Sequence, residues 1–144
     1  MTASSLTFLT SDAERTRRHA ALRAAMAEAG VDALVIWSRG DEFLRGRVQY
    51  VSDIFQWAGW GIVVLPAEGD GTFVGDPLWS VARAEAVEWL PDVRQSADPG
   101  AEVASILDVP AGTVRSRLHH ATRQLRAAIE ADARPASLSE GRPA

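Results

Sequence analysis

The chain has 144 residues, which is enough for one ordinary domain or for a small domain with an appended segment. Its formal net charge of -4 and its lack of cysteine exclude general attraction to polyanions, disulfide bonds, thiolate catalysis and cysteine-ligated zinc. Any affinity for nucleic acid must therefore come from a local basic patch, and all 15 strongly basic side chains are arginines.

The sequence carries no signal for export or for membrane insertion. Its N-terminus lacks a basic segment followed by a long apolar run, so a signal peptide is not expected. No stretch approaches the length of a membrane-spanning helix. These features predict a soluble, cytoplasmic protein that does not associate with membranes.

A flexible arm, residues 1–11, is predicted to precede the first helix. The stretch SDAE is typical of a capping box, in which Ser11 accepts from the backbone of Glu14 and Glu14 reaches back. The periodicity predicts a helix from residue 12 to about 29, which Gly30 ends. Its apolar face holds Leu22, Met26 and Ala29.

The next segment alternates short apolar runs with turn residues. Residues 31–37 are predicted to form a buried strand, and residues 38–59 a loop with a short helix or strand. A glycine-rich turn between 60–66 and 72–75 indicates a β-hairpin. An amphipathic helix at 77–90 and a short strand at 92–96 follow. This order predicts an α/β fold, with a small mixed sheet covered by helices.

Three long runs carry a resemblance over residues 12–100. They are RHAALRAAMAEAGVDALVIWS, VQYVSDIFQWAGWGIVVLP and TFVGDPLWSVARAEAVEWLPDVRQSADPG. This segment resembles the N-terminal domain of the creatinase, prolidase and aminopeptidase P family. The metal-binding peptidase domain of that family has no counterpart in the chain. The resemblance therefore implies an accessory fold for oligomerisation and substrate shaping, without enzyme activity.

No catalytic, metal or cofactor site is expected in this first segment. Its acidic residues are scattered and have no histidine near them to complete a ligand set. His19 is expected on a solvated helix face, and the aromatic residues mostly in the core. The acidic residues are Asp41, Glu42, Asp53, Asp70 and Asp76, and the aromatic residues are Phe55, Trp57 and Trp60.

A second segment begins after the stretch ADPG at 97–100. Residues 101–134 predict a short helix at 101–108, a tight turn at 109–112, and a long helix from Thr113 to about Ala133. Gly112 is expected to adopt the turn geometry and Thr113 to cap the long helix. The polar tail, residues 135–144, is predicted to be disordered.

The long helix is amphipathic and strongly basic. No acidic residue occurs between positions 113 and 129. Such a cationic face matches the major groove of DNA, although a solvated or partner-binding helix has the same composition. The apolar stripe consists of Val114, Leu118, Ala121, Leu125 and Ile129. The neighbouring face consists of Arg115, His119, Thr122 and Arg126, flanked by Arg117 and Arg123.

The contiguous run AEVASILDVPAGTVRSRLHHATRQLR resembles the helix-turn-helix of sigma-factor region 4, of the extracytoplasmic-function type. Asp108 stands where that family usually has glycine. The resemblance implies recognition of a promoter −35 element in double-stranded DNA, with RNA polymerase as a further partner. The first helices of region 4 and all of region 2 are missing, so a complete sigma factor is excluded. The DNA-binding residues would be Thr113, Arg115, Ser116, Arg117, His119, His120 and Arg123.

Two hypotheses follow from the two segments. In the first, the chain is a DNA-binding protein in which an α/β accessory domain, joined to the helix-turn-helix as in a fusion, makes it a homodimer. In the second, it is a non-catalytic oligomerisation or interaction module whose basic helix docks back onto the core.

Overall fold

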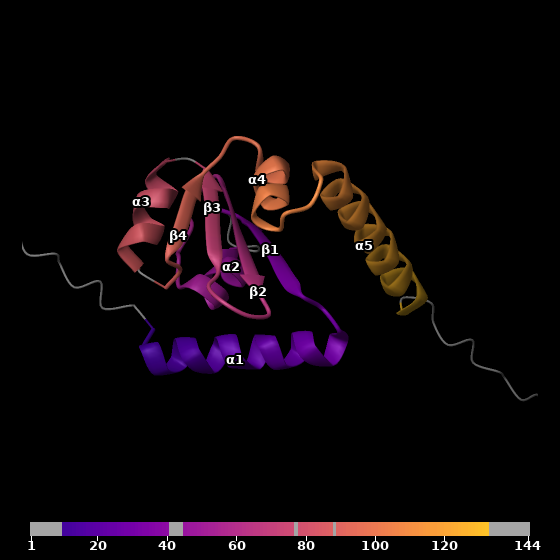
Figure 1. The fold of residues 1–144 in the computed structure, drawn as a ribbon, viewed down its shortest axis with the longest axis horizontal. Coiled ribbons are helices and arrows are strands. Elements are labelled where there is room, and N and C mark those ends of the chain that lie inside the picture. The colour runs from indigo at the N-terminus through magenta and orange to yellow at the C-terminus, as the bar shows by residue number, and fades with distance from the viewer. Residues whose placement is uncertain (1–9, 41–44, 77, 88, 133–144) are drawn as a thin grey trace, which may run out of the picture.

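The computed structural model of the chain describes residues 10–40, 45–76, 78–87 and 89–132 (Figure 1). A four-stranded mixed sheet is surrounded by helices, which confirms the predicted α/β class. The elements in chain order are α1 (Asp12–Ala29), β1 (Ala33–Arg39), α2 (Arg45–Ser52), β2 (Trp60–Pro66), β3 (Thr72–Asp76), α3 (Leu78–Val87), β4 (Asp92–Gln95), α4 (Pro99–Ile106) and α5 (Ala111–Asp132).

The strands lie in the order β1-β2-β3-β4, so β1 and β4 form the two edges. β2 pairs antiparallel with both β1 and β3, which confirms the predicted hairpin. β4 pairs parallel with β3, and α3 makes the crossover connection that parallel strands require. The register pairs Val35 with Val64 and Val74 with Arg94. These pairings show which residues of the four strands share a face of the sheet.

The two ends of α1 are set by local sequence, as predicted. The Ser11 hydroxyl accepts a 3.3 Å hydrogen bond from the Glu14 amide, and Gly30 closes the helix with a left-handed φ of 64°. The Glu14 carboxylate does not complete the capping box, because Arg17 and Arg18 bind it instead. Met26 is the buried residue of this helix.

One face of the sheet carries the main hydrophobic core. The core contains side chains from α2, β2, β3, α3 and the segment that follows α3. Leu22 of α1 packs against this cluster. Burial of these groups is the principal stabilising contribution of the fold. The buried residues are Val48, Val51, Ile54, Val63, Leu65, Phe73, Ala84, Trp89 and Leu90.

The opposite face of the sheet is covered by α4, over β2 and β3. Val103 of α4 lies in a cluster with Ile62, Val64 and Val74. This helix begins at Pro99, two residues before the predicted start, and Asp98 caps it. The first helix of the predicted helix-turn-helix is therefore also a covering helix of the sheet, whereas α5 extends away from the sheet (Figure 1).

The prediction that β1 is a buried strand was wrong for one of its two faces. Val35 and Trp37 are 48% and 44% exposed, because β1 is an edge strand and α4 covers only the central strands. The expectation of a core position was also wrong for Trp57, which is 64% exposed and meets Phe55 edge to face. Trp60 is half-buried against the second cluster.

The prediction that His19 lies on a solvated face was wrong as well. Its Nε2 lies 2.7 Å from the carbonyl oxygen of Val51, and its ring meets Trp89 edge to face. The contact joins α1 to the end of α2, which the sequence spacing could not reveal. His19 is therefore a structural residue between two helices.

Thr10, in the predicted N-terminal arm, is hydrogen-bonded to Asp53, the residue that follows α2. The amide and the hydroxyl of Thr10 donate to the two carboxylate oxygens of Asp53, at 2.8 and 2.7 Å. Asp53 itself has a left-handed φ of 57°. The rest of the arm, residues 1–9, and the tail predicted to be disordered lie outside the described residues.

Candidate nucleic-acid interface

The helix-turn-helix is built by a short turn between α4 and α5. The amide of Val109 donates to the Ala104 carbonyl at 3.0 Å, and the amide of Thr113 to the Pro110 carbonyl at 2.8 Å. Asp108 is the left-handed residue of this turn, with a φ of 50°. Asparagine and aspartate tolerate this conformation better than most residues, and glycine best of all.

Two expectations about the turn were therefore wrong. Gly112 lies inside the first turn of α5. The left-handed conformation predicted for Gly112 is adopted by Asp108 instead. Thr113 is not the N-cap of the long helix, because α5 begins two residues earlier, at Ala111. The helix starts directly after Pro110, whose fixed φ favours a helical start.

The position of α4 is fixed by burial and by one ionic contact. Val103 and Ala104 are 2% and 5% exposed. An Nη1 group of Arg94, on β4, donates to the Glu102 carboxylate at 2.8 Å. Since α4 packs against α5, the sheet supports the start of the basic helix through α4.

The predicted DNA-contacting residues lie on the first four turns of α5. Thr113 is half-buried, because it lies where α5 meets α4. The exposed residues are Arg115, Ser116, Arg117, His119, His120 and Arg123. The rings of His119 and His120 meet edge to face, with centroids 6.1 Å apart. The structure thus brings these side chains to the surface of one helix, and their contact with DNA stays a prediction.

The basic residues of α5 do not all lie on one side of the helix. At about 100° per residue, Arg115, His119 and Arg126 point to one side of the apolar stripe, and Arg117 points to the other. Thr122 lies between the Arg115 side and the stripe, and its hydroxyl donates to the Leu118 carbonyl at 2.8 Å. The hydroxyl of Thr122 is therefore committed to the helix backbone rather than to a ligand.

The arginines of α5 differ from three arginines of the α/β domain that bind carboxylates. Arg17, Arg18 and Arg94 each donate to carboxylates. Among the residues that the structure describes, the α5 arginines have no ion pair or hydrogen bond through their side chains. These arginines, all exposed, are Arg115, Arg117, Arg123 and Arg126. Their charge is available for an external anion.

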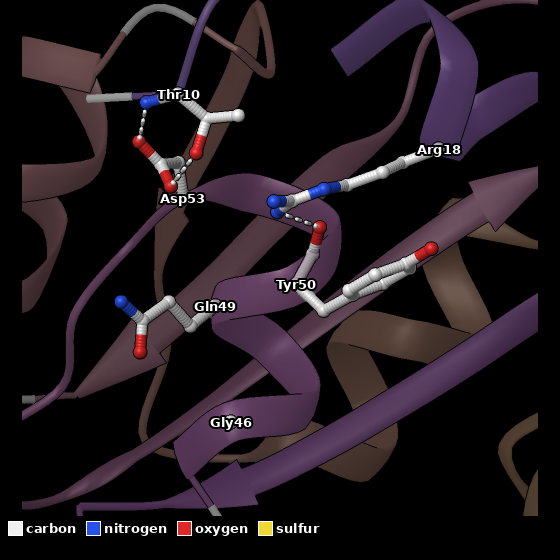
Figure 2. Close-up of a pocket in the computed structure, with 6 residues that line it drawn as sticks. All are labelled: Thr10, Arg18, Gly46, Gln49, Tyr50 and Asp53. Carbon is white, nitrogen blue, oxygen red and sulfur yellow. Dashed lines mark hydrogen bonds between the residues drawn. The ribbon is translucent and has the colours of Figure 1, made fainter. Parts of the chain in front are cut away.

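A shallow hollow of about 270 Å³ lies between α1 and α2, and nothing in the sequence pattern indicated it (Figure 2). The charged groups that line this hollow are hydrogen-bonded to other residues of the chain. The Asp53 carboxylate accepts both bonds from Thr10, and Arg18 donates to the Tyr50 carbonyl (Figure 2). Arg18 also binds the Glu14 carboxylate. Arg18 also lies over the Tyr50 ring, 4.8 Å from its centroid. These contacts join the chain start, α1 and α2.

A second hollow, of about 300 Å³, lies where α4 meets the sheet, beside Arg94. Hydrogen bonds from this guanidinium hold the pKa of Asp92 below its usual value. Within the described ranges, no three His, Asp or Glu side chains form a group suited to a metal ion. Two of the acidic residues considered from the sequence, Asp41 and Glu42, lie outside those ranges.

Among the described helices, none has both the length and the apolar composition needed to span a bilayer. A comparison with protein-family models finds no match for the chain, and a comparison with curated proteins finds no significant relative.

Proposed function

We propose that the chain binds double-stranded DNA through the exposed N-terminal half of α5, in the manner of a sigma region 4 helix-turn-helix. The observation that carries the proposal is the set of exposed arginines without an internal partner, on a helix whose start is fixed to the sheet through α4. Recognition of a −35-like promoter element would place the protein in transcription initiation or its regulation, with RNA polymerase as a protein partner.

The physical basis is the match between α5 and the major groove. A single α-helix fits that groove, and arginine can bind guanine edges bidentately or hold phosphates. The first turn of α5 has no acidic residue, so the positive end of the helix dipole is not neutralised there. Arg115 and His119 lie one turn apart on the same face, where they can reach neighbouring bases.

The test is fluorescence anisotropy of a labelled −35-like duplex, titrated with the protein at several salt concentrations. Each phosphate that the protein neutralises is expected to steepen the log–log salt dependence by about 0.9. A change of Arg115→Ala is expected to weaken binding about 5- to 150-fold if Arg115 reads a base, and Arg117→Ala is expected to weaken it as well.

The matched control is Arg39→Ala, which removes an exposed arginine of β1 that does not belong to the helix-turn-helix. It is expected to leave duplex affinity nearly unchanged. Equal affinities for the wild type, Arg115→Ala and Arg117→Ala would show that this face of α5 does not bind DNA. An equal loss in the Arg39→Ala variant would point to attraction by overall charge.

The exposed edge of the sheet favours a second candidate function, an interaction or oligomerisation module. Val35 and Trp37 place apolar side chains on an edge strand, which commonly adds a strand from a partner. In this alternative, Trp37→Glu abolishes self-association or partner binding, and the duplex titration is flat at low salt. The alternative does not include the predicted docking of α5 onto the core, because α5 extends away from the sheet (Figure 1).

A further inference from the structure

Within the part of the chain that the structure describes, the apolar stripe of α5 is covered at its start alone. Val114 packs there against the chain's own cluster under α4. Farther along the same stripe, Leu118 and Ile129 are 66% and 59% exposed, and Ala121 between them is exposed too. At the rise of an α-helix, about 16 Å of stripe lies open between Leu118 and Ile129. Since helices gain most of their stability from packing such a stripe, this surface favours contact with a partner.

Both sides of the open stripe are positively charged. At about 100° per residue, Arg115 and Arg126 lie along one side of it and Arg117 along the other. No acidic residue occurs between positions 113 and 129. A helix that packs on the stripe places its own flanking residues beside these arginines. A second copy of α5 would bring further arginines there, which is repulsive, whereas glutamate or aspartate is attracted.

These flanking arginines can pair with an external carboxylate without giving up an internal one. Among the described residues, the side chains of Arg115, Arg117 and Arg126 have no ion pair or hydrogen bond. Arg18 differs, because its guanidinium binds Glu14. The arginine side chain suits this pairing, because its planar guanidinium binds a carboxylate through two hydrogen bonds. The open stripe is therefore complementary in charge to an acidic partner.

The spacing along the stripe fits a partner that is itself a helix. Leu118 and Ala121 are three residues apart, and Ile129 lies on the same side of α5. The small Ala121 side chain leaves space into which a larger apolar side chain of a facing helix can insert. Amphipathic helices bind to other proteins through residues at this spacing.

We propose that α5 binds an acidic amphipathic helix of another protein. The apolar residues of that helix pack against Leu118, Ala121 and Ile129, and carboxylates on the two sides of its stripe pair with Arg117 and Arg126. This inference does not depend on the proposed DNA binding, because the three apolar residues are not among the predicted DNA contacts.

Designed peptides test the pairing in a titration with the full chain at low salt, without nucleic acid. The probe is a labelled helical peptide of about three heptads, with leucine at the core positions and glutamate beside them. One control peptide has lysine in place of glutamate, and a second keeps glutamate but has serine in place of leucine. Fluorescence anisotropy is expected to show binding of the probe, and binding of both controls that is weaker by at least about tenfold.

Variants of the chain, each with a control of equal charge, locate the binding surface. Leu118→Glu is expected to weaken binding of the acidic probe by at least about tenfold, whereas Ser116→Glu, on the opposite side of α5, leaves it nearly unchanged. Arg117→Glu is expected to weaken binding of the acidic probe and to strengthen binding of the lysine peptide. Arg123→Glu, which points away from the stripe, is its control and is expected to change both affinities less. Circular dichroism checks that each variant keeps its fold.

Four outcomes would overturn the proposal. They are no binding of the acidic probe up to its solubility limit, equal binding of the leucine and serine peptides, wild-type affinity in Leu118→Glu, and equal losses in Arg117→Glu and Arg123→Glu. The last would show attraction by overall charge rather than docking on the stripe. Since no nucleic acid is present, failure of this proposal leaves the proposed DNA binding standing, and a flat duplex titration leaves this proposal standing.

Discussion

Arg94 on β4 and Glu102 on α4 are joined by a hydrogen-bonded ion pair of 2.8 Å, and the same guanidinium binds Asp92 at 2.7 Å. The pair links an edge strand of the sheet to the first helix of the helix-turn-helix. Together with the buried Val103, it determines where α4 lies, and α4 in turn determines where α5 begins. The direction of the basic helix thus depends on residues outside it.

Loss of this ion pair is expected to cost little stability, because its groups are partly solvated. We expect Glu102→Gln to lower the free energy of unfolding by about 0.2–1 kcal/mol. Arg94→Ala is expected to lower it further, since Asp92 also loses its partner. Urea denaturation measures both variants. Glu28→Gln, which changes an exposed carboxylate of α1, is the control, and an equal loss there would contradict a specific effect.

A pH dependence follows from Glu14. Hydrogen bonds from Arg17 and Arg18 lower the pKa of its carboxyl from 4.5 to about 2. Because the pKa is lowered in the folded state, the stability it contributes is complete above pH 4.5 and is lost as the pH falls toward 2. The difference in unfolding free energy between the wild type and Glu14→Gln is therefore expected to shrink over this range. A difference that stays constant down to pH 2 would contradict the assignment.

We expect a substitution of Asp108, the left-handed residue of the turn between α4 and α5, to stabilise the protein. Asp108→Gly is expected to raise the free energy of unfolding by up to about 1 kcal/mol, because glycine adopts a φ of 50° without the steric cost of a Cβ atom. Asp108→Asn removes the charge but keeps the side chain, and is expected to have a smaller effect. Thermal unfolding compares the three proteins. A gain as large in the asparagine variant would show that charge, not backbone geometry, limits the turn.

Two glycines are expected to respond in opposite ways to alanine. A Cβ atom on Gly61 would collide with the side chain of Gln56, which is fully buried and accepts a hydrogen bond from Ser38. Gly61→Ala is therefore expected to cost about 1–3 kcal/mol of stability. Gly112 lies in α5 with open space around its Cα, so Gly112→Ala is expected to add about 0.5–1 kcal/mol.

Chemical denaturation of both glycine variants, and of Gly61→Ala combined with Gln56→Ala, measures these effects. The second change is expected to restore part of the loss, because it removes the group that the new methyl meets. If the double variant is less stable by the full sum of the two single losses, Gln56 is not the cause of the strain.

Local sequence patterns were sufficient for most of the elements. The helical period, the Ser11 cap and Gly30 predicted α1, and the glycine-rich turn between two apolar runs predicted the β2–β3 hairpin. The lack of an ion pair within the helix could also be predicted for Arg115 and Arg117, because no acidic residue lies within helical reach of them. These features depend on neighbours in the chain, so the sequence by itself determined them.

Only the tertiary structure decided which faces are covered. The strand order places β1 at an edge, which exposes Val35 and Trp37 although their apolar run is typical of a buried strand. Long-range packing also turns α4 into a covering helix and places His19 between α1 and α2. Contacts of this kind join residues far apart in the chain, and the local periodicity of each segment is the same whether or not another segment packs against it.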